Sequence, residues 1–227
     1  MSPSVDEIND TIRYTNWTAF QITGGVDSAH EAVDEWEKLL ASLEASDVIV
    51  RGAYDLQGFR GDADLLIWIH ASEASQVQDA LHRFESTQMG QHTRRTWSGM
   101  ALHRPAEFNR RHVPGFMMGK AAAQWLCFYP FVRSYDWYLL EESERREMLV
   151  EHGKEGSKYP SIISSTVASF GLGDYEWLLA LESDVLHDIV DMMRDLRYTK
   201  ARLHVREEVP FFTGRRMTAH EMGELFS

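Results

Sequence analysis

The sequence of 227 residues contains one cysteine, Cys127, so it cannot form a disulfide within the chain. A chain without disulfides suits a reducing compartment, and we expect a cytoplasmic protein. The sequence also lacks any run of 18 apolar residues and any basic-then-apolar leader at its start. We therefore expect neither a membrane span nor a signal peptide.

The signatures of several enzyme classes are also missing. The chain has no G-x-x-x-x-G-K-[ST], no G-x-G-x-x-G after a predicted strand, no G-x-S-x-G and no H-E-x-x-H. These absences argue against a P-loop, a dinucleotide site, a serine hydrolase and a zinc protease. Positive charge is scarce too, since the formal net charge is −12. Proteins that bind nucleic acids need an excess of Lys and Arg on one surface, so no nucleic-acid partner is expected.

Basic residues are nevertheless concentrated in one segment, from Gln91 to Lys120. This segment has a local net charge of +5, from one acidic residue, Glu107, and six basic residues: Arg94, Arg95, Arg104, Arg110, Arg111 and Lys120. A basic patch in an acidic protein can focus an anionic small molecule toward a cleft. A solvated loop that happens to be basic explains the same pattern, and the sequence leaves both interpretations open.

Two segments of the chain recur at a nearly constant offset. Trp17–Phe20 and Trp125–Phe128 both read W-x-x-F, 108 positions apart, and Gly61–Trp68 resembles Gly173–Ala180, 112 positions apart. Hydrophobic periodicity predicts the order β-α-β-β-α-β in both halves. The predicted ranges are 17–23, 29–43, 48–56, 64–69, 72–84 and 96–102, then 124–132, 143–152, 161–169, 175–181, 185–196 and 201–208.

This element order is that of the ferredoxin-like fold. The predicted class is α+β, with two ferredoxin-like βαββαβ repeats forming a dimeric-type α/β barrel within one chain. We expect an N-terminal repeat at 1–103, an inter-repeat loop at 104–123 and a C-terminal repeat at 124–227. Sheets that pack against each other in this way can enclose a core or a ligand cavity.

The predicted strand at 124–132 continues into a polar segment. Alternation places Cys127, Tyr129, Phe131 and Arg133 on one face of the strand. Tyr129 and Arg133 would lie about 13–14 Å apart at the usual rise per residue. A ligand that touches both must be large and anionic, as a porphyrin is. A buried tyrosine beside an arginine at the rim accounts for the pattern equally well.

Two histidines are candidates for chemistry. His152 lies with Met148 and Leu149 on the apolar side of the helix predicted at 143–152. One imidazole is enough to hold a haem iron, although a histidine on an apolar face is more often a core residue with one hydrogen-bond partner. His112 lies in the basic inter-repeat loop, where it is either an exposed loop residue or a general base.

Seven segments have a joint spacing that is typical of one family: Arg111–Pro114, Tyr129–Ser134, Trp137–Leu140, Glu144–Arg146, Glu151–Gly153, Gly173–Trp177 and Arg206–Arg216. Together they resemble the chlorite dismutase-like superfamily, and more closely its coproheme decarboxylases of the actinobacterial type. The resemblance covers nearly the whole chain and is densest from Glu107 to Glu182.

The resemblance implies catalytic roles in the C-terminal repeat, which would carry the haem site. His152 matches the proximal iron ligand of the family, and Tyr129 matches its radical-forming tyrosine. His112 matches the distal histidine of the actinobacterial branch, which would deprotonate bound peroxide. Chlorite dismutases carry a distal arginine near the position of Ser165, and this departure makes chlorite chemistry unexpected here.

The resemblance also implies residues that bind the substrate, which doubles as the redox cofactor. Arg133 matches a residue that contacts a propionate. Trp137 lies where the family has a tryptophan close to the porphyrin edge, and Phe131 is expected to contact the porphyrin as well.

The implied activity is the hydrogen peroxide-dependent oxidative decarboxylation of two propionates of iron coproporphyrin III (coproheme), which gives haem b through a tyrosyl radical. The implied partners are coproheme, hydrogen peroxide, further copies of the chain in a homopentamer, and the ferrochelatase that supplies coproheme. Two alternatives stay open. One is a coproheme or haem carrier without catalysis, and the other is a chlorite dismutase or dye-type haem peroxidase.

Overall fold

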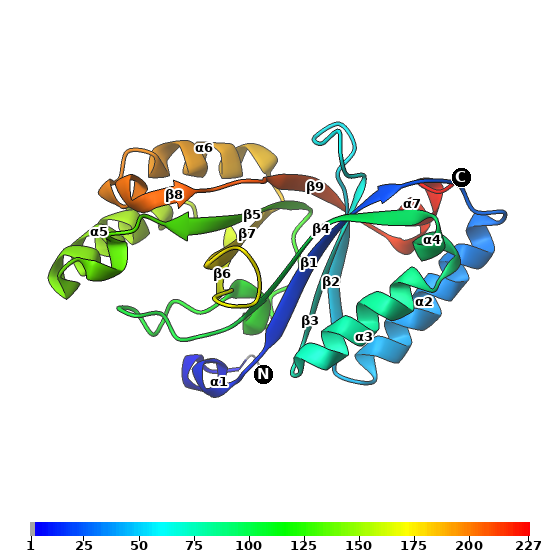
Figure 1. Ribbon diagram of the computed structural model, residues 1–227, viewed down its shortest axis with the longest axis horizontal. Helices are drawn as coiled ribbons and strands as arrows, with labels where there is room; N and C mark the ends of the chain where they lie inside the picture. The colour runs from blue at the N-terminus through cyan, green and yellow to red at the C-terminus, as the bar shows by residue number, and fades with distance from the viewer. Residues whose placement is uncertain (1–2) are drawn as a thin grey trace. The chain divides into compact units, whose positions relative to one another are not determined.

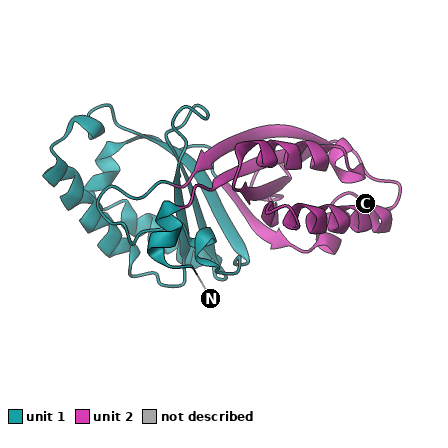
Figure 2. Cartoon of the chain, turned by 90° about the horizontal axis from the view of Figure 1, so that it is seen from below, with its two compact units in different colours: residues 1–10, 104–211 teal, residues 11–103, 212–227 magenta. Residues whose placement is uncertain are grey.

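The computed structural model describes residues 3–227 (Figure 1). The chain divides into two compact units, which Figure 2 colours separately. Unit 1 comprises Arg104–Phe211 with the stretch up to Asp10, and unit 2 comprises Thr11–His103 with Phe212–Ser227. Strands and helices alternate in both units, so the predicted α+β class is confirmed.

Unit 2 contains the first repeat. Its elements are β1 (Tyr14–Ile22), α2 (Ala29–Glu44), β2 (Ile49–Asp55), β3 (Leu65–Ala71), α3 (Ala74–Glu85), α4 (Gln88–Gln91) and β4 (Thr93–Leu102). The strands pair antiparallel in the order β4-β1-β3-β2. This order is that of a ferredoxin-like sheet. Both long helices begin at side-chain caps, because Ser28 accepts a hydrogen bond from the backbone of Glu31 and Glu73 forms a capping box with Gln76.

Unit 1 contains the second repeat. Its repeat elements are β5 (Trp125–Arg133), α5 (Glu142–Gly156), β6 (Ile163–Ala168), β7 (Trp177–Ser183), α6 (Leu186–Leu196) and β8 (Val205–Glu207). The strands pair antiparallel in the order β6-β7-β5-β8, which reproduces the order of the first repeat. Shorter helices complete the unit: α1 (Val5–Asp10), η1 (Gly115–Met118), η2 (Trp137–Leu139) and η3 (Lys200–His204). Both ferredoxin-like repeats are therefore confirmed.

The C-terminal segment differs from the expected domain boundary. β9 (Phe212–Met217) and α7 (Ala219–Glu224) belong to unit 2, where β9 pairs with β2 through Ala53 and Met217. A Cβ atom at Gly214 would lie 2.5 Å from the carbonyl oxygen of Asp55, so only glycine allows this close approach of the two backbones. The second repeat thus ends before Phe212 rather than at the end of the chain.

Aromatic side chains fill the space between helices and sheet in unit 2. Phe84 of α3 meets Phe20 of β1 at 5.1 Å and Trp36 of α2 at 5.6 Å between ring centroids. All three are buried, and they belong to one continuous apolar core. Large side chains pack closely against each other there. The equivalent space in unit 1 is built differently.

Within residues 3–227, none of the helices combines the length and the apolar character needed to cross a membrane.

Candidate functional site

A cavity lies in unit 1 between the sheet and the helices that cover it. Its walls come from β5, β7, α5, α6, η3 and β8, and it is lined by Tyr129, Phe131, Arg133, His152, Leu179, Met193, Leu196, Arg197, Ala201, Arg202, Val205 and Glu208. The α5 and α6 helices lie beside these strands in Figure 1. Tyr129 and Arg133 of β5 face this cavity, on the side of the sheet that α5 and α6 cover.

The alternation predicted for β5 is confirmed. Cys127, Tyr129 and Phe131 belong to the apolar cluster that also contains Ile189 and Met192 of α6. Arg133 follows on the same face at the end of the strand and lines the cavity with Tyr129 and Phe131. The period of two in a strand is what brings a phenol and a guanidinium, four residues apart, into one cavity.

Tyr129 is buried, and its ring stacks on Phe211 at 4.5 Å between centroids. Its hydroxyl donates to the sulfur of Met193 at 3.4 Å. Burial raises the pKa of the Tyr129 phenol above its usual value, and the nearby Glu208 carboxylate raises it further. The phenol therefore holds its proton at neutral pH, and any oxidation of this residue must also move that proton.

The Arg133 side chain lies between two aromatic rings. Its guanidinium carbon is 4.2 Å from the ring centroid of Trp137 and 5.2 Å from that of Phe131. Its backbone N–H donates to Glu176 at 2.9 Å, which fixes the end of the strand. Burial lowers the pKa of Arg133, but the group stays charged because arginine titrates far above neutrality. The rings thus hold a cation at the cavity wall.

His152 lies on α5 and lines the same cavity, although no residue of that helix is fully buried. Its Nδ1 atom is 3.4 Å from the hydroxyl oxygen of Thr199. Burial, followed by the charges of Arg133 and His112, lowers the pKa of His152 to about 4. The imidazole is therefore neutral at pH 7 and can offer a lone pair to a metal ion.

His112 does not line the cavity. It lies in the loop between Leu102 and β5, where its side chain stays in contact with solvent and nearby protein atoms partly desolvate the ring, which lowers its pKa. A protonated His112 would also lower the pKa of His152, so the two imidazoles are electrostatically coupled. Because His112 is uncharged near neutrality, it can accept a proton there.

A family model described as chlorite dismutase matches residues 29–217. The chain belongs to the chlorite dismutase family. Its curated relatives include the coproheme decarboxylase of Mycolicibacterium smegmatis (strain ATCC 700084 / mc(2)155), which is 46% identical over 220 residues and is matched over 96% of this chain and 95% of that protein.

Solved structures of chlorite dismutases share the fold. A variant of the enzyme from Candidatus Nitrospira defluvii superposes with a TM-score of 0.84 at 20% identity, over 96% of each chain. The same enzyme in complex with imidazole gives a TM-score of 0.83 at 21% identity, over 94% of each chain. These structures establish the chlorite dismutase fold for the chain.

The cavity is also lined by two arginines, Arg197 and Arg202, that were not predicted as site residues from the sequence. Arg197 and Arg202 both contact the Glu208 carboxylate through their Nη1 atoms, at 2.7 and 2.8 Å. By contrast, none of the six basic residues of the Gln91–Lys120 segment lines the cavity. Arg95, for example, pairs with Glu85 at 2.6 Å inside unit 2. The positive net charge of the Gln91–Lys120 segment therefore did not predict which arginines line the cavity.

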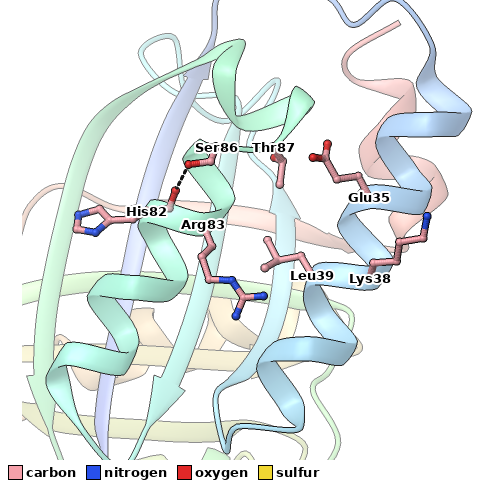
Figure 3. A pocket seen from close by; sticks show the side chains of 7 residues that line it. All are labelled: Glu35, Lys38, Leu39, His82, Arg83, Ser86 and Thr87. Atoms are coloured by element: carbon pink, nitrogen blue, oxygen red, sulfur yellow. Dashed lines mark hydrogen bonds between the residues drawn. The ribbon is translucent and has the colours of Figure 1, made fainter.

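An open groove lies between α2 and α3 in unit 2 (Figure 3). It is lined by Glu35, Lys38, Leu39, His82, Arg83, Ser86 and Thr87. Two of its charged side chains already have partners within the protein, since Glu35 accepts from the backbone of Gln88 and Arg83 donates to Ser42. This groove shares no residue with the cavity of unit 1, and we assign the functional site to unit 1.

Proposed function

We propose that the chain is a coproheme decarboxylase that uses hydrogen peroxide to convert two propionates of iron coproporphyrin III into the vinyl groups of haem b. One observation carries the proposal: a buried phenol, a neutral imidazole and three guanidinium groups line one cavity. The identity of 46% with a coproheme decarboxylase, over nearly the whole of both chains, supports it. A carrier would need the imidazole and the cations, but not the oxidisable Tyr129.

The residues of the cavity fit coproheme by their chemistry. Apolar walls suit the macrocycle, His152 would hold the iron, and Arg133, Arg197 and Arg202 would contact carboxylates. The space itself is about 70 Å³, whereas ligand pockets of this class usually measure several hundred Å³. Coproheme binding therefore requires the walls to separate. The polar contacts among the lining residues that would have to open include the Tyr129–Met193 hydrogen bond and the ion pairs of Glu208.

Bound iron, together with hydrogen peroxide, supplies the oxidising power for the reaction. Each decarboxylation removes two electrons, and it consumes one peroxide and one proton and yields one vinyl group, one carbon dioxide and two water molecules. Tyr129 would lose one electron and its proton, and the resulting radical would take a hydrogen atom from the β-carbon of a propionate. The carbon–carbon bond to the carboxylate then breaks, and the second electron passes to the peroxide-derived oxidant.

His112 would act as the base that takes a proton from hydrogen peroxide. Its lowered pKa keeps the ring neutral, and therefore able to accept a proton, at pH values below the usual range for histidine. Phe131 and Trp137 would confine the Arg133 guanidinium so that it points its charge at a propionate. Charge-assisted contacts of this kind are roughly twice as strong as neutral hydrogen bonds.

We further propose that the protein works in the cytoplasm as a homopentamer and receives coproheme from a ferrochelatase. The single thiol, Cys127, is buried beside the cavity. A free thiol next to an oxidative site is best preserved in a reducing compartment.

One assay tests the activity. The protein is loaded with coproheme, hydrogen peroxide is added in portions, and the product mass is followed. Two successive losses of carbon dioxide are expected, with haem b as the end product. An unchanged porphyrin would identify a carrier instead. Turnover of an added reductant with the porphyrin intact would identify a peroxidase.

A further inference from the structure

Two adjacent residues of α5 contact two adjacent residues at the start of η3. The Glu151 carboxylate accepts from the backbone N–H of Lys200 at 2.9 Å. The next residue, His152, has its Nδ1 atom 3.4 Å from the Thr199 hydroxyl oxygen. Thr199 is only 4% exposed, so water does not compete freely for its hydroxyl. This pair of contacts fixes the His152 side of α5 against the turn that leads into η3.

The direction of the Thr199 contact follows from its second hydrogen bond. A hydroxyl group has one hydrogen, and that of Thr199 goes to the carbonyl oxygen of Leu196 at 2.9 Å. Toward His152 the hydroxyl oxygen can therefore only accept, which requires a hydrogen on Nδ1. The opposite arrangement would give up the shorter bond to Leu196 for the longer one to His152, and would leave the Leu196 carbonyl with only the longer bond from the Thr199 backbone N–H, at 3.3 Å.

We propose that Thr199 is a positioning residue that holds His152 in the tautomer with hydrogen on Nδ1 and a lone pair on Nε2. A neutral imidazole carries one N–H, so fixing it at Nδ1 leaves Nε2 as the only atom able to bind iron. The acceptor is an uncharged hydroxyl rather than a carboxylate, so it strengthens the electron donation of the imidazole only modestly. The part of this inference that concerns iron rests on the proposed function.

The tautomer can be measured without any porphyrin. The chemical shifts of both imidazole nitrogens of His152 are recorded by ¹⁵N NMR at pH 7.5, where a ring with a pKa of about 4 is neutral. His152→Gln identifies the signals. Thr199→Val removes the acceptor with little change of shape, Thr199→Ser keeps it, and Glu151→Gln alters the neighbouring contact alone.

The native protein and Thr199→Ser should show hydrogen on Nδ1 alone, and Glu151→Gln should match them. Thr199→Val should show a mixture of tautomers. Hydrogen on Nε2 in the native protein, or a Thr199→Val spectrum identical to the native one, would overturn the inference. A thermal melt of each variant confirms that it is folded.

A second readout addresses the bound state. In the ferrous coproheme complex, Thr199→Val should lower the iron–histidine stretching frequency and move the midpoint potential to a more positive value, and Thr199→Ser should restore both. Unmoved values would contradict the positioning role. Neither readout depends on peroxide or on decarboxylation. If the tautomer and the frequency shift as expected but coproheme is never decarboxylated, the proposed function fails while the role of Thr199 stands.

Discussion

The Tyr129 hydroxyl donates to the sulfur of Met193, and this 3.4 Å contact joins β5 to α6 across the cavity. The same hydroxyl is the group that we place next to a substrate propionate. Because the phenol has one hydrogen, we expect the contact with Met193 to break when Tyr129 donates to a propionate of bound coproheme.

Replacing Met193 with leucine should therefore be tolerated. Met193→Leu keeps the apolar volume but removes the sulfur acceptor, and such volume-conserving changes usually cost less than about 1.5 kcal/mol. We expect coproheme affinity and the rate of decarboxylation to stay within about threefold of the native values. Absorbance titration and product mass measure the two quantities. A loss of rate of more than about tenfold would mean that the sulfur takes part in the oxidation.

Glu208 competes with the substrate for two guanidinium groups. Arg197 and Arg202 both bind its carboxylate, so Glu208→Gln should free cationic donors for propionates. Because one hydrogen bond to a charged group contributes about 1.5–3 kcal/mol, we expect coproheme to bind about tenfold more tightly to Glu208→Gln and about tenfold more weakly to Arg202→Gln.

Both substitutions should change the binding affinity for haem b less than the affinity for coproheme, because haem b carries two carboxylates rather than four. Glu221→Gln is the matched control, since Glu221 pairs with Arg215 in unit 2. Weaker coproheme binding by Glu208→Gln would show instead that Glu208 is needed to hold the two arginines in place.

The role of His112 predicts a pH-dependent defect. Burial lowers the pKa of His112, so the native protein should lose less of its rate of reaction with peroxide toward acidic pH than it would with an ordinary histidine as the base. His112→Ala should slow this step by about 10²-fold, the usual contribution of a general base. The defect should grow toward low pH, where hydroperoxide anion is scarce. Stopped-flow absorbance at pH 6 and 8 checks this, with the exposed His187→Ala as control. An unchanged rate would remove His112 from the mechanism.

His70 of β3 predicts how stability depends on pH. Burial, and then the charges of Arg13 and Arg51, lower the pKa of His70 to about 3. Arg13 donates to its Nδ1 atom at 2.8 Å. Between pH 6.5 and 3 the His70 imidazole is protonated in the unfolded chain but stays neutral in the folded protein. The free energy of unfolding therefore falls as the pH falls through this range. Between pH 7 and pH 5 this loss amounts to about 2 kcal/mol.

His70→Gln should remove that part of the pH dependence, because glutamine does not titrate and can still accept from Arg13. Urea unfolding at pH 7 and pH 5 measures the difference, and the exposed His187→Gln should leave it unchanged. An equal loss of stability in the native protein and in His70→Gln would contradict the assignment.

Hydrophobic periodicity predicted most of the helices and strands correctly. It failed where apolar residues alternate along the sequence but do not form a strand. The first half of the strand predicted at 201–208 belongs to the helical turn η3, and only Val205–Glu207 forms β8. Ala201, Leu203 and Val205 alternate as in a strand, but Leu203 is 79% exposed. Here the backbone follows a tertiary contact, between Glu151 and the N–H of Lys200, that no local pattern records.

Local sequence patterns likewise predicted only part of the candidate site. Tyr129, Phe131 and Arg133 could be placed together because they share one strand and one face. Bringing His152 to the same cavity depended on a family resemblance, since no spacing links α5 to β5. Arg197, Arg202 and Glu208 were missed because their ion pairs form only after α6 and η3 have folded against the sheet.

We propose that Tyr129 carries the oxidation to the propionate. The most direct test is a single-turnover experiment that compares the native protein, Tyr129→Phe and the exposed control Tyr198→Phe by the mass of the porphyrin after peroxide is added. All three should bind coproheme with similar affinity. The native protein and Tyr198→Phe should release carbon dioxide, and Tyr129→Phe should leave coproheme intact. Decarboxylation by Tyr129→Phe at close to the native rate would contradict the account.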